Sequence, residues 1–182
     1  MKFSGNEKMK PYQHSLVTAF SILSLSTMVI AEEQSAEHGA HQHGSASVTF
    51  VLDGNEAELV LNTAAANIVG FEHKASNATE QQQEAQRLAM LKSGSWFVPV
   101  AAANCSISGQ DFRQEQTGDE HHTDLYINFQ LLCQAPLKLS EISFGLFSQS
   151  PALEKIAVQY LVNGEAGVAE LTAKQPLLKF SR

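Results

Sequence analysis

Residues 46–62, ASVTFVLDGNEAELVLN, decide the fold that this sequence predicts. Val48, Phe50 and Leu52 are apolar at every second position, and the alternation returns in residues 59–61. The intervening Asp53-Gly54-Asn55 is a signal for a tight turn. Because successive side chains of a strand point to opposite faces, the pattern predicts a β-hairpin with one buried face.

Similar alternation recurs along the rest of the chain, between short helical segments. We expect strands over residues 96–100, 105–114, 124–133, 141–147, 155–162, 168–172 and 177–180, and helical segments over residues 63–70, 81–92 and 150–154. Asn77 or Thr79 caps the second helical segment and Gly94 ends it, and Ser150-Pro151 opens the third. These elements predict an α+β fold, with an antiparallel β-rich domain and a few short helices packed on the sheet. Two similar small halves are an alternative arrangement.

The chain has two cysteines, Cys105 and Cys133, at the ends of the expected 105–133 hairpin that lie away from its loop. This position brings them close enough to bridge, and a lone pair in an oxidising compartment usually forms a disulfide. A thiolate zinc site is the weaker alternative because the cysteines lack CxxC spacing. A bridge across this loop stabilises a fold by roughly 3–4 kcal/mol.

The first 31 residues have the pattern of a secretory signal peptide. Lys8 and Lys10 precede an apolar run over residues 16–30, and the chain offers a cleavage site after Ala31. An uncleaved anchor is the weaker alternative, because a spanning helix needs roughly 20 apolar residues. We expect a leader over residues 1–31, a flexible His-rich arm over 32–45 and a folded periplasmic domain over 46–182, without membrane insertion after cleavage.

The composition favours cations as partners. The 182 residues carry a formal net charge of −7, and without the expected leader, which holds three lysines and one glutamate, the charge is −9. An acidic protein repels phosphate backbones and anionic lipid surfaces and attracts metal ions. Nucleic acid is therefore not an expected partner.

The expected arm carries an H-x2-H-x-H motif, His38, His41 and His43. Zinc binds neutral imidazole nitrogens and usually takes four ligands, and short His-rich tracts are a recognised metal-binding composition. The three imidazoles can wrap one ion, with Glu37, Glu32 or water as a further ligand. The alternative is a solvated tail in which histidine is merely tolerated.

A second candidate group lies at the expected tip of the 105–133 hairpin and consists of Asp119, Glu120, His121 and His122. Its carboxylates can bind a metal or orient the imidazoles, although a charged loop tip explains them equally well. His73 is a further candidate ligand, with a packed or capping histidine as the alternative.

The residue types favour zinc over other metals and binding over catalysis. Met90 is the only methionine after Ala31, so a thioether Cu(I) site is unsupported, and nitrogen and oxygen ligands suit Zn²⁺, with Cu²⁺ and Ni²⁺ as competitors. The sequence has no H-E-x-x-H, G-x-S-x-G, P-loop or Rossmann glycine motif. We expect zinc as bound cargo and no enzymatic activity.

Several segments resemble the ZrgA-like family of bacterial periplasmic zinc-uptake proteins. They are residues 38–44 leading into the first strand, the string ANIVGFEH at residues 66–73, the cysteine pair, and residues 147–156. The resemblance covers residues 36–180 and implies a Gram-negative periplasmic protein that binds zinc and assists a zinc import system. Family members commonly carry a long His/Asp/Glu-rich central insertion, where this chain has only residues 119–122.

The expected function is therefore capture of Zn²⁺ for a membrane zinc import system. An exported protein-interaction or structural module with incidental histidines is the alternative, and a metalloenzyme is the least favoured. Stoichiometric zinc binding that is lost near pH 5, where imidazole protonates, distinguishes the first from the second.

Overall fold

The computed structural model describes residues 43–116 and 122–180. The predicted first hairpin is confirmed: β1 (Ser45–Asp53) pairs antiparallel with β2 (Glu56–Ala64). Its alternate apolar side chains, among them Phe50 and Leu59, are buried, whereas the side chains between them face solvent more. The period-two pattern therefore places one face of this hairpin in the core.

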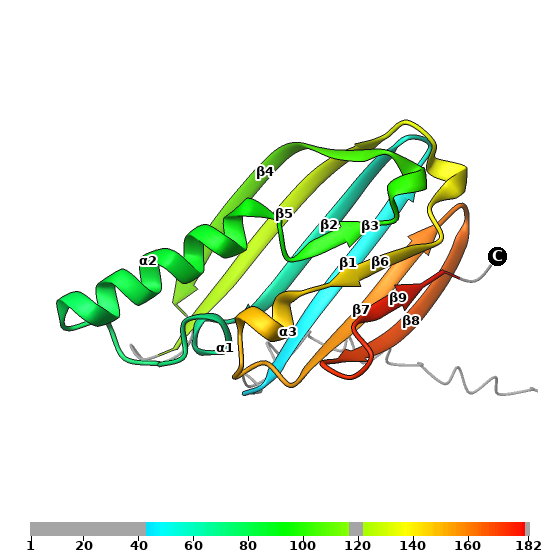
Figure 1. Cartoon of the computed structure of the whole chain (residues 1–182). Coiled ribbons are helices and arrows are strands. Elements are labelled where there is room, and N and C mark those ends of the chain that lie inside the picture. Colours follow the sequence, from blue (N-terminus) through cyan, green and yellow to red (C-terminus); the bar gives the residue numbers. More distant parts are fainter. Residues whose placement is uncertain (1–42, 117–121, 181–182) are drawn as a thin grey trace, which may run out of the picture. The chain divides into compact units, whose positions relative to one another are not determined.

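A six-stranded sheet with the order β4-β5-β2-β1-β7-β8 forms the larger layer (Figure 1). β4 (Cys105–Gln116) and β5 (Thr123–Cys133) make the second hairpin, and β7 (Lys155–Val162) and β8 (Glu165–Thr172) make the third. Neighbours are antiparallel except β1 and β7, which run parallel. Because β7 returns to lie beside β1, the N-terminal and C-terminal segments share one sheet.

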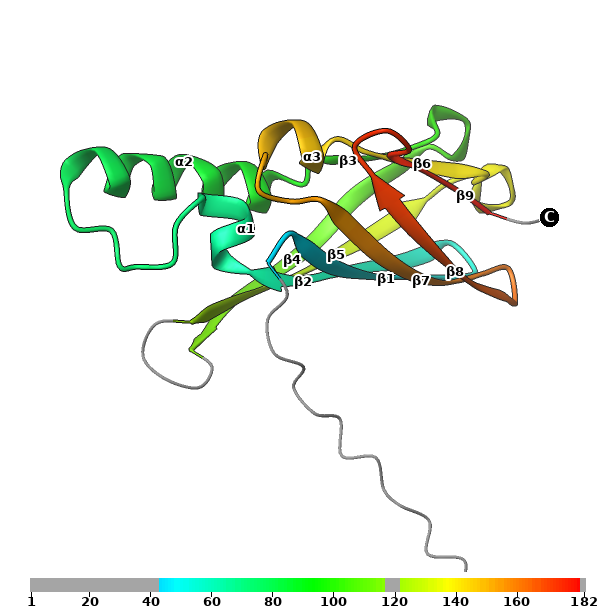
Figure 2. The same cartoon turned by 90° about the horizontal axis from the view of Figure 1, so that it is seen from below.

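A three-stranded sheet, with the order β3-β6-β9, forms a second layer (Figure 2). It consists of β3 (Phe97–Pro99), β6 (Glu141–Phe144) and β9 (Leu177–Lys179). Large aromatic side chains fill the space between the layers, and Trp96 contacts both Phe129 of β5 and Phe144 of β6. The strands predicted over residues 96–100 and 177–180 are thus confirmed, and they are the two outer strands of this small sheet.

The helical segments after β2 also follow the sequence signals. α1 (Ala65–Val69) ends at Gly70, and α2 (Ala78–Ser93) begins after Asn77, whose side chain accepts a hydrogen bond from the Glu80 backbone N–H. α2 ends at Gly94 as predicted. Leu91 is the buried residue of α2, Leu88 and Met90 pack partly against the core, and the N-terminal part of the helix extends beyond the sheet in both views (Figures 1 and 2).

The predicted helical turn over residues 150–154 is wrong. The helix lies earlier, at α3 (Leu146–Gln149), so β6 ends before Phe147 rather than including it. Ser150 closes this helix instead of opening one, because its backbone N–H donates to the Leu146 carbonyl. Pro151 follows without a backbone N–H to continue it. Two short 3-10 helices, η1 (Ala101–Ala103) and η2 (Pro136–Lys138), complete the connections.

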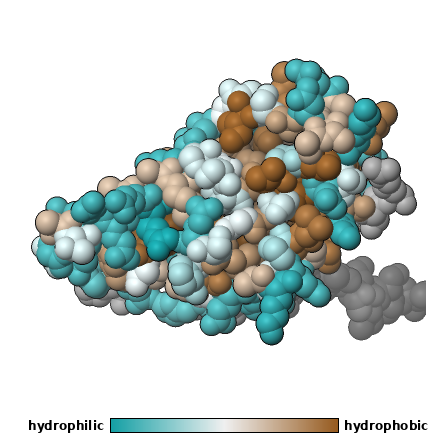
Figure 3. All heavy atoms as spheres, in the orientation of Figure 1, coloured by the Kyte–Doolittle hydropathy of each residue, from teal (hydrophilic) through white to brown (hydrophobic). Residues whose placement is uncertain are grey.

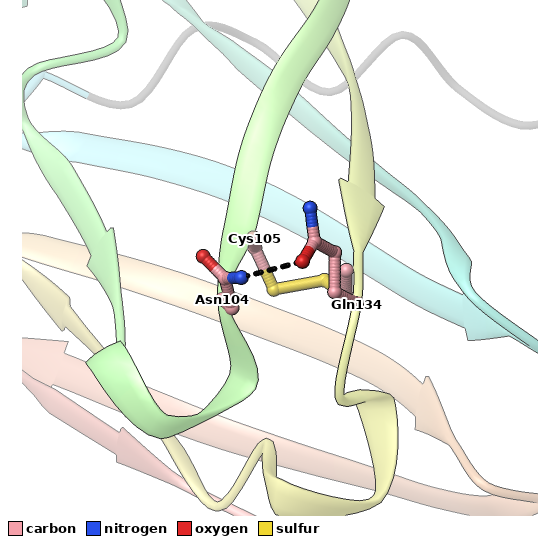
Figure 4. The surroundings of a disulfide bond; sticks show 4 residues. Asn104, Cys105 and Gln134 are labelled. Atoms are coloured by element: carbon pink, nitrogen blue, oxygen red, sulfur yellow. Dashed lines mark hydrogen bonds between the residues drawn. A yellow bond between two sulfur atoms is a disulfide. The ribbon is translucent and has the colours of Figure 1, made fainter.

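The predicted disulfide is confirmed between Cys105 and Cys133, which face each other across β4 and β5 (Figure 4). Beside it, the side-chain nitrogen of Asn104 donates to the side-chain oxygen of Gln134 at 2.8 Å. The bridge closes the hairpin at the end opposite to the 117–121 loop. It therefore ties together the strand ends that lead into η1 and η2.

The surface differs between the helix and the small sheet. Figure 3 shows a mainly hydrophilic surface over α2 and hydrophobic residues over the region of β3 and β6. Val98 of β3 is 60% exposed and contributes to that apolar surface. Within residues 43–116 and 122–180, no helix is long and apolar enough to cross a membrane.

Candidate metal-binding site

Segments that carry candidate ligands meet at one end of the six-stranded sheet. Strand pairing places Ala46, near the start of β1, beside Thr63, and Ala64, at the end of β2, beside Asp124. The start of β1, the end of β2 and the loop end of the β4–β5 hairpin are therefore neighbours (Figure 2). Histidines adjoin these chain ends, because residue 43 precedes β1, residue 73 follows α1 and residue 122 precedes β5.

Asn67 of α1 holds the chain where it enters β1. Its Oδ1 atom accepts a hydrogen bond from the Gly44 backbone N–H at 2.8 Å, and its Nδ2 atom donates to the Ser45 carbonyl at 2.8 Å and to Thr63 Oγ1 at 3.1 Å. Asn67 is only 2% exposed. Because unpaired buried polar groups are costly, these bonds fix the path of the backbone here.

Gly44 makes this entry possible. Its φ is +75°, and a Cβ atom on it would lie 3.0 Å from the side chain of Glu154. Its carbonyl accepts hydrogen bonds from the backbone N–H groups of Glu154 and Lys155 at 2.7 and 2.9 Å. The residue that links the expected arm to the domain is therefore bound on both sides, by α1 and by the start of β7.

His43 lies just before this clamp and contacts a carboxylate. Its Nε2 atom is 3.0 Å from Oε1 of Glu72, and both side chains are substantially exposed. Glu72 follows the end of α1 at Gly70, whose φ of +94° is the left-handed conformation that ends the helix. α1 thus supports both partners, since it holds the backbone beside His43 and leads directly into Glu72.

His73 contacts a second carboxylate, that of Glu80, which follows it in the first turn of α2. Its Nε2 atom is 3.2 Å from Oε1 of Glu80, and its ring stacks on Phe71 with 5.0 Å between ring centroids. Oε2 of Glu80 accepts hydrogen bonds from the backbone N–H and the hydroxyl of Ser76, at 2.8 and 3.0 Å. The Ser76 N–H, followed by the contact with His73, lowers the pKa of Glu80 to about 2.

A hollow of about 670 Å³ lies between the segment after α1 and the loop end of the β4–β5 hairpin. Its lining includes Phe71, Glu72, His73 and Glu84 on one side and Gln114 and Thr123 on the other. Imidazole and carboxylate groups are ligands that zinc accepts. The lining therefore offers donor types that a divalent cation accepts, beside the ammonium group of Lys74.

The structure locates part of the predicted ligand set. His43 and His73 lie at the same end of the domain, and His122 is half-buried directly before β5. The other candidate ligands lie outside the described residues, namely His38, His41, Asp119, Glu120 and His121. Among the residues that are described, no group of three or more His, Cys, Asp or Glu side chains is gathered closely enough to hold a metal ion.

Three residues that the sequence did not single out as ligands or supports belong to this region. Asn67 and Glu72 lie within the string ANIVGFEH, which indicates the family resemblance but assigns no role to either residue. Glu80 stands three residues after the helix cap Asn77, a spacing that indicates a capping carboxylate. Nothing in the spacing alone indicated that this carboxylate would also reach His73.

The fold and these contacts define a β-rich, disulfide-bonded domain with one histidine–carboxylate pair where the N-terminal segment enters the sheet and a second between the end of α1 and the first turn of α2. A family model described as ZrgA family zinc uptake protein matches residues 40–180. This match covers most of the chain, which therefore belongs to the ZrgA family of zinc uptake proteins. A comparison with curated proteins gave no match.

Proposed function

We propose that this protein captures Zn²⁺ in the periplasm and assists a membrane zinc import system. Membership of a zinc uptake family supports zinc as the cargo. The observation that carries the proposal is the meeting of three histidine-bearing segments at one end of the sheet. Donors that are far apart in sequence can there serve the same ion or pass it on.

The proposed ligands come from the arm, the hairpin loop and the folded domain. His38, His41 and His43 supply imidazoles from the arm, and His73 adds one from the domain. Residues 119–122 supply two carboxylates and two further imidazoles. A catalytic zinc needs a rigid three-ligand site with an open position, whereas donors on an arm and a loop suit capture and transfer. Zinc is accordingly cargo, and we propose no enzymatic role.

The compartment is part of the proposal. Residues 1–31 act as a leader, residues 32–45 as the arm, whose last residue Ser45 already belongs to β1, and residues 46–182 as the domain. The Cys105–Cys133 disulfide favours an oxidising compartment. Mass spectrometry of the protein released from the periplasm tests this point. A chain that begins at Glu32 is expected, and a chain that stays in the cytoplasm with residues 1–31 attached would refute it.

Zinc binding by equilibrium dialysis tests the function against its main alternative. The purified protein is expected to bind Zn²⁺ at pH 7 and to release it near pH 5, where imidazole protonates. A variant with all six histidines after Ala31 changed to Gln should lose this binding while keeping its fold. Equal zinc binding by the wild type and this variant would favour an interaction module with incidental histidines.

A further inference from the structure

The two histidine–carboxylate pairs share one feature. In each pair the carboxylate faces Nε2 of the ring, at 3.0 Å between Glu72 and His43 and at 3.2 Å between Glu80 and His73. A neutral imidazole carries its proton on one nitrogen and a lone pair on the other. When Nε2 donates its proton to a carboxylate, Nδ1 keeps the lone pair that binds a metal.

We propose that Glu72 and Glu80 are positioning residues that hold His43 and His73 through Nε2 and thereby present Nδ1 of each ring to Zn²⁺. This inference rests on the proposed zinc-capture function and specifies how two of its ligands work. It assigns roles to two carboxylates outside the initial set of candidate ligands.

His73 contacts two groups, one of which is itself held by hydrogen bonds. Its ring stacks on Phe71, and its partner Glu80 belongs to the first turn of α2. The second oxygen of Glu80 accepts hydrogen bonds from Ser76, which favours the orientation in which Oε1 faces the ring. Metal-binding histidines generally use such a bonded carboxylate to fix their tautomer and ring orientation.

His43 is fixed through its backbone instead. Asn67 binds Gly44, the next residue, and the Gly44 carbonyl is bound by the start of β7. These hydrogen bonds therefore hold the backbone next to His43 in place, with the His43 side chain beside Glu72.

The carboxylates could instead bind zinc directly, and the two arrangements differ at the ring nitrogens. In the proposed arrangement, zinc sits on Nδ1 and Nε2 keeps its proton. If Glu72 or Glu80 bound zinc directly, the hydrogen bond from Nε2 to the carboxylate would be lost. The ring would then bind zinc through Nε2 or would not bind it. Two-bond ¹H–¹⁵N NMR spectra of histidine-labelled protein report which nitrogen is protonated and which binds the metal.

The experiment titrates Zn²⁺ into the purified wild-type protein and into Glu72→Gln, Glu80→Gln and the control Glu170→Gln, which changes an exposed glutamate of β8. We expect zinc on Nδ1 of His43 and His73 in the wild type. Zinc binding at each ring should weaken roughly 10- to 100-fold in the variant that lacks its carboxylate. The control should match the wild type.

Three results would overturn the inference and leave zinc capture standing. The first is zinc on Nε2 of these rings, and the second is unchanged binding at both rings in Glu72→Gln and Glu80→Gln. The third is a zinc response at other histidines with none at His43 and His73. If no histidine of the wild type responds to Zn²⁺, the proposed function itself fails.

Discussion

The side-chain oxygen of Asn67 lies 2.8 Å from the backbone nitrogen of Gly44 and accepts its hydrogen bond across 23 residues of sequence. The same amide donates to the Ser45 carbonyl, so one side chain satisfies the backbone on both sides of the entry to β1. Three residues after Asn67, α1 ends and the chain turns towards Glu72 and His73. The Asn67–Gly44 hydrogen bond therefore links the position of the chain before β1 to the position of Glu72, which follows α1.

Replacing Asn67 with Ala should destabilise the domain. The change removes the side-chain partner of the buried Gly44 N–H, while the Ser45 carbonyl keeps the Thr63 hydroxyl, and it costs about 1–3 kcal/mol in the free energy of unfolding. Urea denaturation of Asn67→Ala beside the wild type measures the loss. The control Asn62→Ala, on the solvent side of β2, should stay within about 0.5 kcal/mol. Equal stability of Asn67→Ala and the wild type would show that the clamp contributes nothing.

Glu80 should stabilise the fold at neutral pH and lose this effect in acid. Its pKa is lowered to about 2 in the folded protein from 4.5, chiefly by the Ser76 N–H. Because the folded-state pKa is the lower one, the stabilisation is present above pH 4.5 and fades as the pH falls towards 2. Glu80→Gln should therefore melt below the wild type at pH 7, and the two melting temperatures should converge in that window.

Circular dichroism melts between pH 7 and pH 2 check this dependence. Glu84→Gln is the control, because Glu84 lies beyond the first turn of α2 where capping acts. A melting difference between Glu80→Gln and the wild type that persists unchanged to pH 2 would contradict the assigned role.

The disulfide should be a major contributor to stability. Changing Cys105 and Cys133 together to Ser removes a crosslink across 28 residues and should lower the free energy of unfolding by about 3–4 kcal/mol. Denaturation of the double variant, and of the wild type with and without reductant, measures the effect. The reduced wild type and the double variant should agree. A wild type that is insensitive to complete reduction would contradict this expectation.

Most of the fold could be predicted because its signals are local. Alternation in residues 46–62 places β1 and β2, and left-handed Gly70 and Gly94 end the two helices after them. The turn at Ser150 was mispredicted because Ser before Pro is typical both of a helix start and of a chain that is leaving a helix. The buried Leu146 and Phe147 decide between the two by packing, which local sequence does not reveal.

The candidate site was less predictable because it depends on pairings between distant segments. The sequence indicates histidine as the relevant chemistry, but the parallel pairing of β1 with β7 and the position of α1 determine what surrounds His43. The contact of Glu80 with His73 depends on the loop between α1 and α2, whose conformation has no periodic signal. The sequence thus indicates histidine as a ligand type, and the tertiary structure shows which carboxylates lie beside His43 and His73.

Calorimetric titration of Zn²⁺ into the purified protein, beside a variant with His38, His41 and His43 changed to Gln, tests the central claim most directly. We predict saturable zinc binding by the wild type, and a variant that loses a site or binds more weakly. Chelation by imidazole is the physical reason, since zinc favours such nitrogen ligands. The absence of saturable binding by the wild type would contradict the claim that this protein captures zinc.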